Sequence, residues 1–145
     1  MTVKVQSEDF DLAMEIEGFG AGAGAVVTFT GLVRDLPDRS LSVMLIEHYP
    51  AMTEKALSEI EADARSRWSL TDCIIVHRYG PLKPGDRIMM VATASAHRKD
   101  AFEAAEFLMD YLKSRAPFWK KEISGTGEAW VDSKVSDEES LNRWS

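Results

Sequence analysis

Cysteine is almost missing from this sequence: its 145 residues contain one, Cys73. A single cysteine excludes an internal disulfide and a cysteine-rich zinc site. The first ten residues include Lys4, Glu8 and Asp9, so they lack the apolar stretch of a signal peptide. Apolar runs elsewhere are strand-sized and far shorter than a membrane span. Together these absences predict a cytoplasmic protein.

Positive charge is also scarce, with 17 lysines and arginines against 24 aspartates and glutamates and a net charge of -7. Proteins that bind nucleic acid usually carry the opposite sign, because phosphate neutralisation dominates their affinity. The charge balance therefore disfavours an RNA-binding module, although FWKK at 118–121 places aromatic residues beside lysines. The length and the 45% hydrophobic content predict one globular domain, 1–145, with an acidic tail from about residue 136 that is loosely held.

Glycine is concentrated in one segment, GFGAGAGA at 18–25. A dinucleotide-binding fingerprint needs G-x-G-x-x-G between a strand and a helix. Here the glycines simply alternate, position 23 is alanine, and a strand-like run follows. The segment is therefore predicted to be a flexible connector. A Walker-type lysine motif and a G-x-S-x-G motif are also missing.

The hydrophobic pattern predicts a mixed fold. Strands are expected at 2–6, 25–34, 42–49, 73–79, 87–94, 118–123 and 128–132. Helices are expected after Ser7 as an N-cap, from Pro50 to Trp68, and from about 96 to 115, with a turn at 80–86. The buried stripe of the last helix is predicted to be Phe102, Ala105, Met109 and Leu112. Paired strands separated by helices indicate an α+β fold with a mainly antiparallel sheet.

His97 and Arg98 form the first group of candidate site residues. They open the longest helix, with Ser95 available as its cap. Cations at a helix N-terminus oppose its dipole by about 0.3–1 kcal/mol each, and such a local violation is expected where function requires it. Together with the free N–H groups they indicate an anion site. Two surface residues whose small cost the fold absorbs are the alternative.

Lys113, Arg115, Lys120 and Lys121 form the second group. Lys113 and Arg115 suit a helix C-terminus and could simply compensate the dipole. Lys120 and Lys121 point to opposite faces of a strand, so only one of them can join a shared site. If Lys120 shares a hollow with Lys113, repulsion and burial lower one lysine pKa towards neutrality and give a general acid or base.

The remaining nucleophile and metal candidates are weak. Cys73 and His77 lie on one face of a strand but about 13 Å apart, too far for a thiolate–imidazole pair. A lone cysteine in an apolar strand is more often part of the core. His48, His77 and His97 have no ligand-like spacing, so no metal site is predicted.

Four segments resemble the large subunit of molybdopterin synthase: VVTFTGLVRD (26–35), LIEHYPAMTEKAL (45–57), TASAHRKDAFEAAEFLMDYLKSRAPFWKKE (93–122) and W-V-x-x-K (130–134). The resemblance implies an α/β hammerhead core with a small antiparallel subdomain, forming a homodimer. In that family each protomer binds a small ubiquitin-like sulfur carrier, which gives a heterotetramer. The carrier's C-terminal Gly-Gly thiocarboxylate delivers two sulfurs to cyclic pyranopterin monophosphate, which becomes the dithiolene of molybdopterin. No cofactor or metal takes part.

The resemblance also assigns roles to residues. Lys113 would stabilise charge on the carrier's acyl group or assist its release by water, and Lys120 would donate or accept a proton. Six positions match substrate-binding residues: Arg34, His97, Arg98, Lys121, Glu122 and Lys134. The family has arginine where this chain has Lys134, which keeps the charge but loses bidentate phosphate geometry. An alternative function, a non-catalytic adaptor that binds the carrier tail, would require loss of the lysines or of the His-Arg pair, and all are present.

Overall fold

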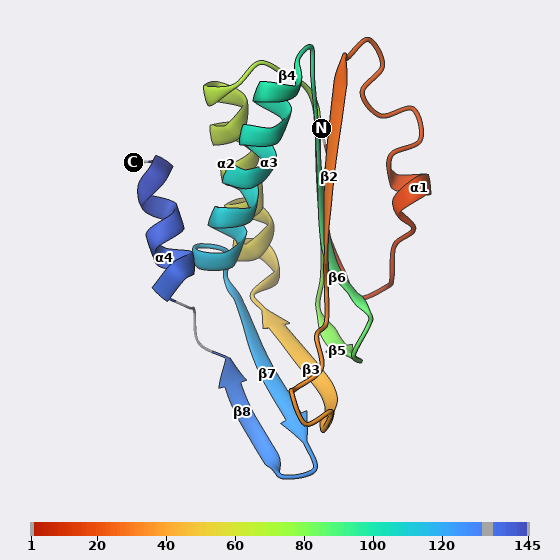
Figure 1. Ribbon diagram of the computed structural model, residues 1–145, viewed down its shortest axis with the longest axis vertical. Coiled ribbons are helices and arrows are strands. Elements are labelled where there is room, and N and C mark those ends of the chain that lie inside the picture. The colour runs from red at the N-terminus through yellow and green to blue at the C-terminus, as the bar shows by residue number, and fades with distance from the viewer. Residues whose placement is uncertain (1, 132–134, 145) are drawn as a thin grey trace.

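Two four-stranded sheets meet end to end in the structure, a computed structural model that describes residues 2–131 and 135–144 (Figure 1). In chain order the elements are β1 Thr2–Gln6, α1 Leu12–Glu15, β2 Ala25–Leu32, β3 Leu41–His48, α2 Pro50–Arg67, β4 Leu70–Arg78, β5 Gly80–Leu82, β6 Arg87–Ser95, α3 Arg98–Ser114, β7 Phe118–Ser124, β8 Gly127–Val131, α4 Val135–Leu141 and a 3₁₀ turn Asn142–Trp144. The α+β class and the predicted strands are confirmed, except that the turn expected at 80–86 contains the short strand β5.

The first sheet has the order β1-β4-β6-β2, with β1 parallel to β4 and the other pairs antiparallel. Its central strands β4 and β6 are apolar on both faces because both faces are covered. Helices α2 and α3 pack on one face, around Ile75 and Val91, and α1 with its flanking loop packs on the other, around Val76 and Met90 (Figure 1). None of the described helices is long and apolar enough to cross a membrane.

The second sheet has the order β5-β3-β7-β8 and is antiparallel throughout. It continues from the end of the first sheet at which α3 ends, and β7 leads directly away from that helix (Figure 1). This sheet corresponds to the small antiparallel subdomain that the resemblance implied. Its junction with the first sheet brings the C-terminal end of α3 next to β7.

Helix α3 packs on the sheet through a stripe that differs from the predicted one. Its buried residues are Ala101, Ala104, Ala105, Phe107, Leu108 and Leu112. Phe102, predicted to be buried, is 59% exposed, because small alanines let the helix approach β6 along a stripe rotated by one position. The predicted cap is also wrong. His97 is the N-cap residue, without a side-chain capping bond, and the Ser95 hydroxyl donates to the Ser69 carbonyl at 2.7 Å instead.

The first helix and the glycine segment differ from prediction in detail. Helix α1 is one turn long, and the carboxylate of Asp11 caps it by accepting from the Met14 N–H, so Ser7 is not the cap. The glycine segment connects α1 to β2 as expected. It also packs closely, because a Cβ atom on Gly24 would lie 2.2 Å from the carbonyl oxygen of Ala96.

The acidic tail, predicted to be loosely held, folds against α3 as α4 and the 3₁₀ turn. Leu141 is buried, and the Arg143 guanidinium contacts Glu106 at 2.8 Å and Asp110 at 2.6 Å. The Trp144 indole also donates to Asp110 at 2.6 Å. The contacts of Arg143 and Trp144 therefore hold the tail on α3, although the residues before them are acidic.

Candidate active site

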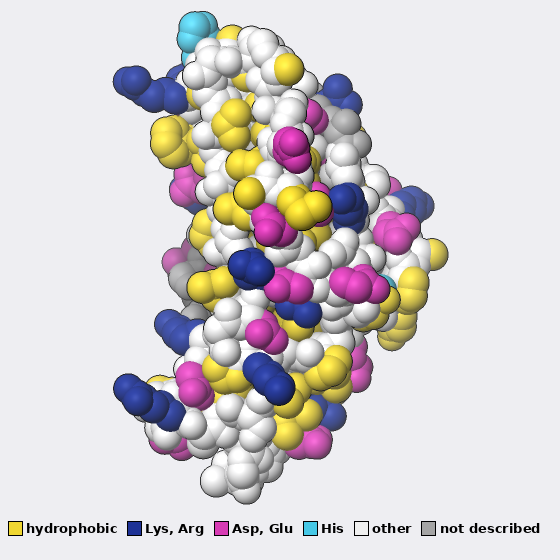
Figure 2. Space-filling view, turned by 90° about the vertical axis from the view of Figure 1, so that its right-hand side faces the viewer, with side chains coloured by type: hydrophobic (Ala, Val, Ile, Leu, Met, Phe, Trp, Pro, Cys, Tyr) yellow, Lys and Arg dark blue, Asp and Glu magenta, His cyan; other side chains and the backbone are white. Residues whose placement is uncertain are grey.

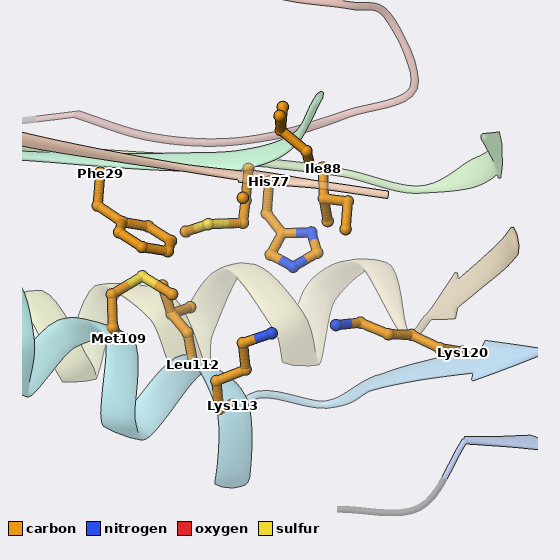
Figure 3. Close-up of a pocket in the computed structure, with 10 residues that line it drawn as sticks. Phe29, His77, Ile88, Met109, Leu112, Lys113 and Lys120 are labelled. Atoms are coloured by element: carbon orange, nitrogen blue, oxygen red, sulfur yellow. The ribbon is translucent and has the colours of Figure 1, made fainter. Parts of the chain in front are cut away.

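Lys113 and Lys120 line one cavity at the junction of the two sheets, where Figure 3 shows their amines pointing towards each other. Lys113 lies in the last turn of α3, and Pro117 then prevents the helix from continuing. The chain enters β7 at Phe118, so Lys120 faces back towards the helix end. The structure therefore brings together the two lysines that the sequence suggested could share a hollow.

The cavity has a volume of about 60 Å³ and is apolar apart from one cationic end. Its apolar lining consists of Phe29, Gly31, Leu32, Ile88, Met89, Met109 and Leu112. Burial in this lining is the main cause that lowers the pKa of Lys120 to about 8, and the nearby Lys113 lowers it further while Asp137 opposes the shift. A lysine with such a pKa exchanges protons near neutral pH, as a general acid or base must.

His77 also lines the cavity, a position that no sequence pattern predicted. Its ring is 3% exposed and stacks on Phe118 with centroids 3.6 Å apart. Burial lowers the pKa of His77 to about 3, and the charges of Lys120 and Lys113 lower it in the same direction, against a hydrogen bond to the backbone of Arg78. Strand alternation could place His77 on the helix-covered face of β4, but it could not show that β7 crosses there.

His97 and Arg98 lie far from this cavity within one chain. They are exposed at the N-terminal end of α3, whereas Lys113 lies in its last turn. At 1.5 Å per residue, the 15 positions from Arg98 to Lys113 separate the two groups by about 22 Å along the helix. Arg34 is exposed and follows Leu32, which lines the cavity, by two positions. The cavity lysines and the His-Arg pair are therefore separate constellations in the monomer.

The other matched positions are arranged around the second sheet. Lys121 lies on the face of β7 opposite to Lys120, where its amine contacts Glu128 at 3.2 Å and covers the ring of Trp130. Glu122 shares the face of Lys120 by strand alternation but does not line the cavity. Lys134 lies outside the described residues. The described residues also contain no group of three or more side chains that could hold a metal ion.

Cys73 is fully buried in β4, and burial is the main cause that raises its pKa to about 12, with Glu61 and Asp72 acting in the same direction. A thiol in such a setting does not supply a nucleophilic thiolate. We therefore expect Cys73→Ala to retain the wild-type turnover number. The only expected loss is about 1 kcal/mol of unfolding free energy, as for an average point substitution. Denaturant titration and an activity assay test both, and a collapse of turnover in a folded variant would contradict the core assignment.

Comparisons with known proteins agree on one family. The family described as MoaE protein matches residues 5–115. The "Molybdopterin synthase catalytic subunit" of Cereibacter sphaeroides is 58% identical, with 99% of this chain and 100% of that protein covered. A protein of the same name from Yersinia pestis is 62% identical over 83% of this chain and 81% of its own length.

Solved structures give the same result. The MoaE protein of Burkholderia ambifaria superposes with a TM-score of 0.84 at 51% identity, with 99% of this chain and 97% of that chain covered. The molybdopterin synthase of Staphylococcus aureus superposes with a TM-score of 0.78 at 34% identity, with 89% and 96% covered.

Proposed function

The chain belongs to the MoaE protein family of molybdopterin synthase catalytic subunits, and we propose that its lysine cavity is where sulfur transfer takes place. The observation that carries this proposal is the meeting of Lys113 and Lys120 in one cavity, with the pKa of Lys120 lowered to about 8. An adaptor that only binds a carrier tail needs positive charge but no lysine that titrates near neutral pH.

The shape and charge of the cavity fit the end of an extended peptide. A volume of about 60 Å³ is too small for a pterin but accommodates a few heavy atoms. Its apolar walls suit a glycine tail, and its two amines suit an anionic thiocarboxylate. We therefore propose that the Gly-Gly terminus of a small ubiquitin-like carrier subunit enters here. The phosphorylated pterin would lie at the mouth of the cavity.

The lysines can then divide the chemistry. The thiocarboxylate sulfur bonds to a carbon of cyclic pyranopterin monophosphate while a carbon–oxygen bond at that carbon breaks. The departing oxygen takes a proton from Lys120, and the carrier's acyl carbon is then joined to the pterin through sulfur. The Lys113 ammonium stabilises negative charge on the acyl oxygen. Lys120 exchanges the protons that the steps require, and water releases the carrier as a carboxylate. A second thiocarboxylated carrier repeats the sequence and completes the dithiolene. Because its substrates would be a carrier protein and a phosphorylated pterin, we propose that the reaction takes place in the cytoplasm.

A second copy of the chain can supply the cations that the cavity of a single chain lacks for binding the phosphate. Strand β2 is an edge of the first sheet and exposes Val26, Phe29 and Leu32, and helix α3, which contacts this strand, exposes Phe102. Figure 2 looks onto the side of the molecule that carries α1, and there too hydrophobic side chains reach the surface between charged ones. An exposed apolar sheet edge of this length favours pairing with another chain. We propose that two copies associate here to form the homodimer.

The direction of β2 makes this dimer functional. The strand begins beside Ser95, with which Ala25 pairs, and ends at Leu32 on the cavity. Antiparallel pairing about a two-fold axis brings the helix start of the partner subunit towards the cavity. His97 and Arg98 of the partner subunit, with Arg34, would then hold the phosphate and pterin oxygens next to the lysines. Two such dimerised subunits with two carriers make a heterotetramer.

Arg98 provides a direct test of this arrangement. Removing one charge-assisted hydrogen bond costs about 1.5–3 kcal/mol, so Arg98→Ala should weaken binding of the pterin phosphate by roughly 10- to 150-fold. Its affinity for the carrier should be unchanged, because the carrier tail enters at the lysine end. Calorimetry with each ligand separates the two effects. Loss of carrier affinity instead would place Arg98 in the protein–protein interface.

The overall function is tested by incubating the chain with thiocarboxylated carrier and cyclic pyranopterin monophosphate, followed by mass spectrometry of the pterin. We expect two sulfurs in the product and carrier returned as its carboxylate. Binding of the carrier without any carbon–sulfur bond formation would instead support the adaptor function.

A further inference from the structure

His77 presents a fixed hydrogen-bond acceptor to the cavity. Its Nδ1 lies 2.8 Å from the carbonyl oxygen of Arg78. A carbonyl can only accept, so Nδ1 carries the proton of the neutral ring and Nε2 carries a lone pair. Stacking on Phe118, with an interplanar angle of 13°, prevents the ring from turning over. Figure 3 shows the ring directed towards the space that Lys113 and Lys120 share.

The cavity is suited to a bound water. A water needs roughly 10–15 Å³ of such volume and two to four polar partners, and the cavity offers about 60 Å³. Of the ten described residues that line it, three carry side-chain nitrogen atoms: His77, Lys113 and Lys120. The ammonium form of each lysine donates only, so His77 is the one lining side chain that accepts through nitrogen whatever the protonation of the lysines.

We propose that His77 positions the water that releases the carrier from the pterin. This inference rests on the proposed function, because it concerns the second half of each sulfur transfer. The water donates one hydrogen to His77 Nε2 and the other to the neutral amine of Lys120. It accepts a hydrogen bond from the ammonium of Lys113. The remaining lone pair of its oxygen is then directed at the acyl carbon.

The step balances without any further reactant. The water oxygen bonds to the acyl carbon while the carbon–sulfur bond to the carrier breaks. The carrier leaves as a carboxylate, and the pterin keeps the sulfur as a thiolate. Of the two protons of the water, one passes to Lys120 and the other is lost to solvent from the new carboxyl group.

His77 orients this water but takes no proton from it. The groups that face the ring are Lys113 from α3, Lys120 from β7 and His48 from β3. All three disfavour an imidazolium, and burial does so more strongly, so the pKa of His77 is lowered to about 3. The proton therefore goes to Lys120, whose pKa of about 8 makes it the better acceptor.

The test compares His77→Phe, which keeps an aromatic ring to stack on Phe118 but removes the acceptor, with His77→Gln, which restores an acceptor oxygen. Each full-length variant is mixed with thiocarboxylated carrier and pterin, and single turnovers are quenched and examined by intact mass spectrometry. For His77→Phe we expect carbon–sulfur bond formation within about threefold of wild type. Carrier release should be slower by about tenfold or more, the effect of losing one hydrogen bond to the reacting water.

The carrier–pterin thioester should therefore accumulate in His77→Phe, and less of it should accumulate in His77→Gln. Equal slowing of both steps would reduce His77 to a structural residue, as would unchanged release in His77→Phe. If the wild-type chain formed no carbon–sulfur bond, the proposed function itself would be contradicted. This outcome is distinct from those that contradict only the role of His77.

A measurement on the wild-type protein remains decisive if these variants do not fold. Nitrogen-15 NMR of histidine-labelled protein should show His77 as the neutral Nδ1–H tautomer from about pH 6 to 9. A protonated Nε2 in this range would overturn the proposal, because the water would then have no acceptor.

Discussion

Lys120→Arg should lower the rate of sulfur transfer by roughly 10²–10⁴-fold, and as severely as Lys120→Ala, because this is the usual range for losing a general acid or base. Arginine keeps the positive charge of lysine, and its side chain is long enough to reach the same space. Its guanidinium stays protonated under all working conditions, however, so it cannot exchange the proton. Both variants should remain folded and bind the carrier. Lys55→Arg, on the exposed side of α2, is the matched control and should behave as wild type.

The pH dependence gives the same prediction an independent measure. Burial and the neighbouring Lys113 disfavour the ammonium of Lys120, so its amine becomes neutral at about pH 8 instead of near its ordinary 10.5. If the neutral amine is the acting form, the rate should rise tenfold per pH unit below about 8 and level off above it. This limb should disappear in Lys120→Arg. Near-normal turnover in that variant would show that Lys120 acts through its positive charge alone. The proton transfer would then be assigned to Lys113.

Mixing two inactive variants should restore about a quarter of wild-type activity if the site is shared between subunits. In a dimer of Lys120→Ala with Arg98→Ala, one site carries both changes and the other carries neither. Random pairing makes about half of all dimers mixed, and half of the sites in each mixed dimer are intact. The assay uses a pterin concentration too low for Arg98→Ala alone. Different tags on the two chains allow the mixed dimers to be isolated, and these should show about half of wild-type activity.

The matched control for this experiment pairs Lys113→Ala with Lys120→Ala. Both residues lie in the same cavity, so every site of every dimer remains damaged and no recovery is expected. If the first mixture forms dimers but also fails to recover, Arg98 acts within its own chain or outside the site. The proposed position of β2 at the dimer interface would then be wrong.

Local sequence rules predicted the part of the site that is local. Pro117 ends a helix between Lys113 and Lys120, and the following strand returns the second lysine towards the first, so their meeting could be anticipated. The family resemblance and the α+β class were likewise predictable and are confirmed by the relatives and by the sheets. The catalytic roles assigned to the two lysines remain predictions.

The errors arose where tertiary packing decides between similar local choices. Phe102 was assigned to the buried stripe because aromatic residues dominate a helical pattern, while the alanines that pack on β6 contribute little to it. The tail was judged by its acidic residues, although Arg143 and Trp144 hold it on α3 through Asp110. His77 was dismissed because the strand that completes its surroundings lies 41 positions away, at Phe118.

The site therefore depends on two kinds of contact that differ in contact order. The two lysines are seven positions apart, and closing so short a segment costs little chain entropy. Their geometry can form as soon as α3 ends and β7 begins. His77 reaches them only after β4 and β7 have been brought together from distant parts of the chain, a contact of the kind that forms late and slowly. A partly folded subunit could thus hold its paired amines in place and still lack the histidine that directs water to the acyl carbon.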